Sequence, residues 1–177
     1  MPKFACVCVR AGAERRAAGY INQMWPGVDA TGLERVFYRS VNGVRHTEKQ
    51  QLMSGYIFLR LYELPPATEL PHIPGFIRVL DYRPGEWELA GSDLAFAEYV
   101  FANNGVLGIS KACKIGDRIR LVEGPLKDME GSILKMDRHR KNGLVEIGYH
   151  GRSFQVWLPF DVVQTTPEKG ADPSKNR

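Results

Sequence analysis

The sequence has no apolar run approaching the roughly 20 residues that a helix needs to cross a bilayer. The apolar run in its first segment, MPKFACVCVRAG, is too short for the core of a signal peptide, and arginines soon follow it. Internal repeats and low-complexity tracts are also missing. With 44% hydrophobic and 25% charged residues, the composition is that of an ordinary globular protein. We therefore expect a cytoplasmic protein without a membrane anchor.

Cysteine is scarce, with only Cys6, Cys8 and Cys113 in 177 residues. An odd number does not suit a disulfide framework and fits a reducing compartment. Cys6 and Cys8 lie two apart on a predicted strand and so share one face. We interpret them as small buried side chains rather than metal ligands, because three cysteines and scattered histidines lack the spacing of a zinc site. The sequence predicts no metal and no cofactor.

Catalytic motifs are equally hard to find. The stretch VEGPLKDMEG, with Gly124 and Gly131, is not a phosphate-binding loop, because such a loop needs Lys-Ser/Thr leading into a helix and a predicted strand follows here. Asp137 and His139 are two residues apart on a predicted strand, where a solvated pair is far commoner than an acid/base pair. We expect a protein that is not an enzyme.

The charge is unevenly distributed along the chain. The net charge is +4 and the pI about 9.0, which suits an acidic partner. Residues 111–152 contain ten basic and six acidic side chains, so their excess of four equals the whole net charge. Within them, Arg138-His139-Arg140-Lys141 forms a basic cluster that we place at a hairpin tip.

The pattern of residues predicts two domains. Residues 1–103 read as an α+β domain, with helices packed on a mostly antiparallel sheet. A linker is predicted at 104–116, a small β-barrel at 117–164 and a disordered tail at 165–177. The elements expected in the first domain are a strand at 4–9, a helix at 13–24, a hairpin turning at Asn42-Gly43, a central strand at 55–64, a strand at 76–80 and a helix capped by Ser92 or Asp93.

Two surfaces are candidates for binding. Leu52 and Met53 adjoin the entry to the central strand, where both cannot easily turn inward, so we expect an exposed apolar patch and a protein partner. In SFQVWLPF, alternation leaves Gln155 and Trp157 outside the core. An exposed indole near the basic cluster could stack on an unpaired base, whereas burial of Trp157 and a merely solvated hairpin tip are the alternatives.

Taken in order, these segments resemble the NusG family of transcription elongation factors over residues 4–163. FACVCVRAG and LMSGYIFLRL resemble strands of the family's N-terminal (NGN) domain, and Ile73-Pro-Gly-Phe76 resembles the turn that follows. IGDRIRLVEGPLKDMEG is similar to the KOW motif, whose turn here would consist of Gly124, Pro125 and Gly131, with both glycines serving backbone geometry. GYHGRSFQVWLPFDVV resembles the motif's closing strands.

The resemblance implies an NGN domain, an antiparallel sheet with flanking helices, followed by an SH3-like KOW barrel. It implies a monomer whose first domain docks on the clamp helices of RNA polymerase, near the non-template DNA strand. Leu52, Met53 and Tyr56 would occupy the polymerase-docking strand, and Arg10 and Arg16 the DNA-facing positions. No catalytic residue is implied.

The sequence also departs from the family's usual pattern. Leu52, Met53 and Ser54 replace the aromatics and proline of the docking motif, and His150 replaces an aromatic used by housekeeping members to recruit Rho or a ribosomal protein. The basic KMDRHRKNG resembles LoaP, a specialised antitermination branch whose KOW domain binds RNA. We therefore predict a bacterial antiterminator that suppresses pausing and termination. Its predicted contacts with nascent RNA are Lys135, Arg138, His139, Arg140, Lys141 and Trp157.

Two other functions remain open from the sequence. One is a housekeeping pause and elongation regulator that couples polymerase to a protein partner. The other is a ribosome-associated KOW protein that binds RNA without a role at the polymerase. The sequence leaves undecided whether the second domain can refold into helices.

Overall fold

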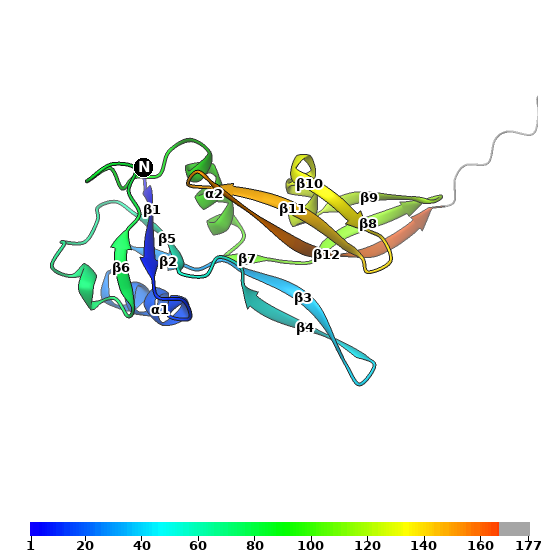
Figure 1. Cartoon of the computed structure of the whole chain (residues 1–177), viewed down its shortest axis with the longest axis horizontal. Helices are drawn as coiled ribbons and strands as arrows, with labels where there is room; N and C mark the ends of the chain where they lie inside the picture. The colour runs from blue at the N-terminus through cyan, green and yellow to red at the C-terminus, as the bar shows by residue number, and fades with distance from the viewer. Residues whose placement is uncertain (167–177) are drawn as a thin grey trace, which may run out of the picture. The chain divides into compact units, whose positions relative to one another are not determined.

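The computed structural model describes residues 1–166, and its chain divides into two compact units (Figure 1). Unit 1 comprises Met1–Arg35, Lys49–Leu107 and Tyr149–Gly151. Unit 2 comprises Val36–Glu48, Gly108–Gly148 and the residues from Arg152 onward. The predicted disordered tail falls mostly outside the described residues. None of the helices in the described part of the chain is long and apolar enough to span a membrane.

Unit 1 is built on a four-stranded sheet in the order β2-β5-β1-β6, in which β1 pairs antiparallel with both β5 and β6. Helix α1 packs its small and apolar residues Ala17, Ala18 and Ile21 into the core of this sheet. The elements that lie mainly in this unit are β1 (Lys3–Val9), α1 (Glu14–Met24), β2 (Asp29–Thr31), β5 (Tyr56–Leu61), η1 (Leu70–His72), β6 (Phe76–Val79), α2 (Gly91–Ala102) and β7 (Val106–Leu107).

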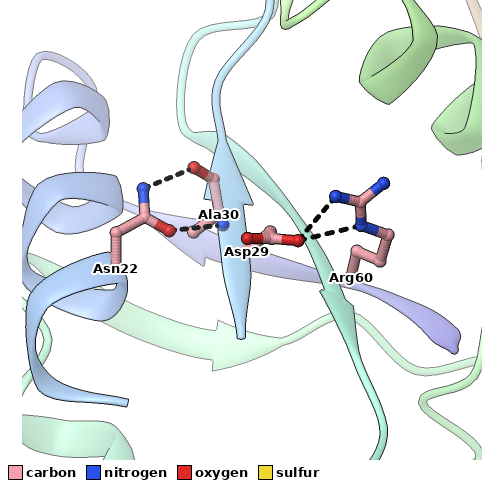
Figure 2. A network of polar contacts seen from close by, with 4 residues as sticks. All are labelled: Asn22, Asp29, Ala30 and Arg60. Carbon is pink, nitrogen blue, oxygen red and sulfur yellow. Dashed lines mark hydrogen bonds and ion pairs between the residues drawn. The ribbon is translucent and has the colours of Figure 1, made fainter. Parts of the chain in front are cut away.

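Strand β2 is the short outer strand of this sheet, and one side chain satisfies its free peptide groups. The Asn22 amide nitrogen donates to the Ala30 carbonyl oxygen (2.9 Å), and the Ala30 N–H donates to Asn22 Oδ1 (2.7 Å) (Figure 2). On the neighbouring strand, Arg60 donates from Nη2 to Asp29 Oδ2 at 2.6 Å. Because unpaired edge groups invite pairing with other strands, the Asn22 contact fastens α1 to the sheet and closes its edge.

The hairpin predicted at Asn42-Gly43 is confirmed. Strands β3 (Glu34–Val41) and β4 (Val44–Gln51) flank it, and β3 also pairs in parallel with β7. Asn42 and Gly43 both have positive φ, 52° and 78°, as a tight two-residue turn between twisted strands requires.

Unit 2 contains a five-stranded sheet in the order β10-β11-β12-β8-β9. The predicted α+β fold with a second, β-rich region is thus confirmed. The predicted linker 104–116 was wrong in part, because it contains β7 and β8, and β8 pairs in parallel with β12 far along the chain. The elements are β8 (Ser110–Ile115), β9 (Arg118–Glu123), α3 (Pro125–Asp128), η2 (Glu130–Ser132), β10 (Ile133–Asp137), β11 (Asn142–Tyr149) and β12 (Arg152–Thr166).

The two edges of this sheet come together at one point. Arg138, just after edge strand β10, donates from Nη1 to the backbone carbonyl of Asp117, just before edge strand β9 (3.1 Å). A sheet whose edges meet in this way tends toward a closed barrel. The contact is consistent with the small barrel predicted for this part of the chain.

Candidate nucleic-acid and protein interfaces

The first candidate site is the turn at residues 52–56, between β4 and β5. Its backbone is fixed at both ends, because the Leu52 N–H donates to the Leu33 carbonyl (2.7 Å) and the Gly55 N–H donates to Glu14 Oε1 (2.6 Å). Burial alone would raise the pKa of Glu14, but the hydrogen bond from Gly55 and other N–H groups lowers that pKa below its ordinary value. Glu14 therefore holds the turn as a carboxylate.

The side chains of this turn do not form the expected exposed patch. Met53 is only 7% exposed, so the prediction that it lies on the surface was wrong. The Gln51 side chain donates to the Met53 carbonyl (3.1 Å), which holds the backbone where the Met53 thioether is buried. Leu52 and Tyr56 are half-buried and remain available at the surface.

Beside Tyr56 lies an aromatic cluster that sequence reasoning missed. The Tyr149 ring packs edge-on against Tyr56 and Phe58, with centroids 6.3 and 5.3 Å apart, and lies 5.5 Å from Phe96. Phe58 and Phe96 also meet edge to face at 5.8 Å. Tyr149 is 5% exposed, so its ring is buried within this cluster. The only sequence signal was an aromatic residue directly before a His-Gly turn.

Asp93 anchors the turn that carries Tyr149. Its Oδ1 accepts from the His150 N–H (2.9 Å) and its Oδ2 from the Tyr82 hydroxyl (2.7 Å). The sequence had suggested Ser92 or Asp93 as a helix cap, which was wrong because α2 begins at Gly91 and Ala90 is the capping residue. His150, which has a positive φ of 48°, reaches Asp93 only because the turn bends sharply.

The two arginines predicted to face DNA lie close together in the sequence and are both exposed. Arg10 follows β1 and its N–H donates to the Gly75 carbonyl (2.8 Å), whereas Arg16 lies in the first turns of α1. Within residues 1–166 neither guanidinium forms an ion pair, whereas Arg15 between them pairs with Glu34 at 3.0 Å. Their contact with DNA stays a prediction.

The basic cluster forms the tip that the sequence predicted, between β10 and β11. Arg138, His139 and Arg140 are exposed, and Lys141 has a positive φ of 55°. The tip is ordered by Asp137, whose Oδ1 accepts from the Arg140 N–H at 2.9 Å and whose pKa is lowered by that bond. The cationic side chains thus project from a fixed backbone.

The dipeptide Asn142-Gly143, which follows the tip, does not form its turn. Both residues belong to β11, and Gly143 lacks a positive φ. A Cβ at Gly143 would lie 2.6 Å from Leu126 Cδ2, so this glycine serves close packing instead of a turn.

Lys135 and Trp157, the remaining predicted RNA contacts, lie on the strands of unit 2. Lys135 is exposed on β10, and Trp157 is 37% exposed on β12. Val156 and Leu158 beside it are buried, so the predicted alternation is confirmed. The indole is thus partly accessible.

Only one of the two glycines of the predicted KOW turn is needed for backbone geometry. Gly124 has a φ of 93°, and a Cβ there would lie 2.9 Å from Ser110 Cα. Pro125 follows as the buried first residue of α3. Gly131 has no positive φ and open space around it, so the geometric role predicted for it was wrong.

Cys6 and Cys8 differ more than their shared face suggests. Cys6 is fully buried, and this burial raises the pKa of its thiol from 9.0 to about 12. Cys8 is half-buried, and burial raises its pKa as well. In residues 1–166 no three His, Cys, Asp or Glu side chains come together where they could hold a metal ion.

Cys6 should therefore resist alkylation at pH 8, whereas Cys113, which is half-buried on β8, should react. The folded protein favours the protonated thiol. The contribution of Cys6 to the free energy of unfolding is therefore fully present below about pH 9 and is lost as the pH rises toward about 12. Iodoacetamide labelling followed by peptide mass spectrometry measures the order of reaction. Labelling of Cys6 as fast as Cys113 in the folded protein would contradict this prediction.

Known proteins resemble this chain in structure. No protein-family model and no curated protein matches the sequence. Eighteen chains of solved structures match the fold. Among them is NusG of Thermotoga maritima, for which a domain interaction is described, with a TM-score of 0.50 and 18% sequence identity over 90% of this chain and 94% of that chain. The chain thus has a NusG-like fold.

Proposed function

We propose that this protein is a transcription elongation factor of the antitermination kind. It would bind RNA polymerase through the surface around Leu52 and Tyr56 and hold nascent RNA with the basic tip of unit 2. The observation that carries this proposal is the NusG-like fold over 90% of the chain, combined with an ordered cationic tip where the sequence resembles RNA-binding relatives. Arg10 and Arg16 supply positive charge for nearby non-template DNA.

The transcription test compares wild type with Leu52→Glu. Purified bacterial polymerase should read through an intrinsic terminator more often when the wild-type protein is present, on a template that carries the native leader. Leu52→Glu should remove this effect, because a carboxylate at a half-buried apolar contact is costly to desolvate. Ile77→Glu is the matched control, since Ile77 is 57% exposed elsewhere in unit 1. Met53 is unsuitable because a charge there would be buried.

Each outcome distinguishes among the functions considered. Unchanged readthrough with wild-type protein would contradict antitermination. Polymerase binding together with equal affinity for leader and scrambled RNA would favour a general pause and elongation regulator. Absence of polymerase binding, with RNA binding retained, would favour a ribosome-associated protein.

The position of Tyr149 suggests how polymerase binding is limited. Its ring packs edge-on against Tyr56, so a partner that needs this edge of the Tyr56 ring must displace it. Tyr149→Ala should therefore increase the affinity for polymerase, whereas Trp157→Ala should leave that affinity unchanged. Fluorescence titration of labelled protein with polymerase measures both, and equal affinities for wild type and Tyr149→Ala would argue against competition.

A further inference from the structure

The basic tip at 138–141 is accompanied by a second basic segment that was not among the predicted RNA contacts. Lys114, Arg118 and Arg120 lie on β8 and β9, on either side of the turn at Gly116 and Asp117, and all three are exposed. In residues 1–166 none of them forms an ion pair or side-chain hydrogen bond. Their charges are therefore available to a ligand.

The strand register places two of these arginines on one face. Arg118 lies opposite Ile115 and Arg120 opposite Cys113 in the antiparallel β8–β9 pair. Alternate residues of a strand share a face about 6.8 Å apart, and the intervening Ile119 turns to the other side. The buried Leu121 on that other side marks the core. Arg118 and Arg120 thus form a short cationic row facing solvent.

Arg138 joins this row to the tip. Its Nη1 donates to the Asp117 carbonyl at 3.1 Å, which draws the turn before Arg118 against the tip that carries Arg140 and Lys141. Two other basic side chains of unit 2 are paired within the molecule, Lys111 with Glu123 at 3.0 Å and Lys127 with Glu130. In residues 1–166 the arginines of the two adjoining turns form no such ion pair, so these turns carry a cluster of unneutralised positive charge.

We propose that the two turns form one binding site for the phosphodiester backbone of RNA, in which Arg118 and Arg120 contact phosphates and Arg138 positions the turns. This inference rests on the proposed RNA-binding function and extends it to residues outside the tip. Positive groups that track a nucleic-acid backbone bind phosphates without reading the bases. Sequence preference would come from groups other than this row.

The full-length protein, a 20-nucleotide oligouridylate and the matching deoxythymidine strand allow a direct test. Each phosphate contact to a single strand contributes about 0.7 to the slope of log affinity against log salt, which corresponds to about fivefold in affinity at 0.1 M salt. Arg118→Gln should therefore weaken RNA binding about fivefold and lower the slope by about 0.7. Arg152→Gln, an equal charge change at the start of β12, should have little effect because the length of β11, roughly 25 Å, separates it from the tip.

A double-mutant cycle tests the positioning role of Arg138. The effect of Arg118→Gln should fall below twofold in an Arg138→Gln background and stay near fivefold in an Arg138→Lys background, where a donor to Asp117 is retained. Independent effects of Arg118 and Arg138 would overturn this role. Equal weakening by Arg118→Gln and Arg152→Gln would overturn the site.

Heparin chromatography separates failure of this site from failure of the proposed function. If wild-type protein binds no RNA but Arg118→Gln still elutes from heparin at lower salt than Arg152→Gln, the anion site stands and the RNA function fails. If the deoxythymidine strand binds as tightly as oligouridylate, the assignment to RNA is overturned while the phosphate site remains.

Discussion

Replacing Phe58 by alanine should lower the free energy of unfolding of unit 1 by about 3 to 5 kcal/mol, the usual cost of removing a buried phenyl ring. Phe58 is fully buried on β5, an inner strand of the unit 1 sheet. Its ring meets both Phe96 and Tyr149 edge to face, so the substitution removes two aromatic contacts besides leaving a cavity. Urea denaturation followed by circular dichroism measures the change.

Tyr62→Ala is the matched control for this prediction. Tyr62 follows the same strand but is 70% exposed, so removing its ring should change the stability by no more than about 0.5 kcal/mol. If both substitutions cost the same, burial within the aromatic cluster would not explain the role of Phe58. A cost below about 1 kcal/mol for Phe58→Ala would contradict the prediction, because it would show that neighbouring side chains fill the space left by the ring.

Local sequence signals predicted the local structure well. The Asn42-Gly43 turn was predictable because few dipeptides accept two positive φ angles in succession. The helix predicted at 13–24 is confirmed as α1, in which residues at helical spacing such as Ala17 and Ile21 are buried. Met24, the last residue of the helix, is 53% exposed.

The predictions that were wrong concern residues whose structure depends on partners far away in the sequence. Strand β8 was interpreted as linker because Gly108 precedes it and Ser110 begins it, and its partner β12 lies about 50 residues later, which no local pattern reveals. Glu14, at the start of α1, can be buried because the Gly55 N–H supplies a hydrogen-bond partner from a distant segment, which the sequence did not reveal.

The residues of the candidate sites were likewise predictable where local sequence determines their position, and unpredictable where distant segments do. The basic tip between β10 and β11 and the outward position of Trp157 on β12 follow from turn chemistry and from alternation along one strand, so the sequence sufficed for them. The inward turn of Met53 and the ring contacts of Tyr149 depend on packing between distant segments. Arg118 was overlooked because the role we propose for it depends on the Arg138–Asp117 contact, which joins residues 21 apart.

The largest effect expected in unit 2 is that of Gly124→Ala, which should cost about 2 to 5 kcal/mol. A residue with a side chain at a φ of 93° is strained by roughly 1 to 2 kcal/mol. The added Cβ would also lie 2.9 Å from Ser110 Cα, a backbone atom that cannot rotate away, and such overpacking typically costs a further 1 to 3 kcal/mol. The shift would strain the Leu126 N–H to Ser110 Oγ hydrogen bond, which is 2.9 Å long.

Gly131→Ala, seven residues further along the same turn, provides the control. Gly131 has an ordinary φ and nothing within 4 Å of an added Cβ, so alanine should be neutral or stabilise by up to about 1 kcal/mol through the lower entropy of the unfolded chain. Thermal denaturation of the two variants beside wild type measures the difference. If Gly131→Ala were the more damaging substitution, the glycine would be required by something other than the folded backbone, such as close approach of a bound partner.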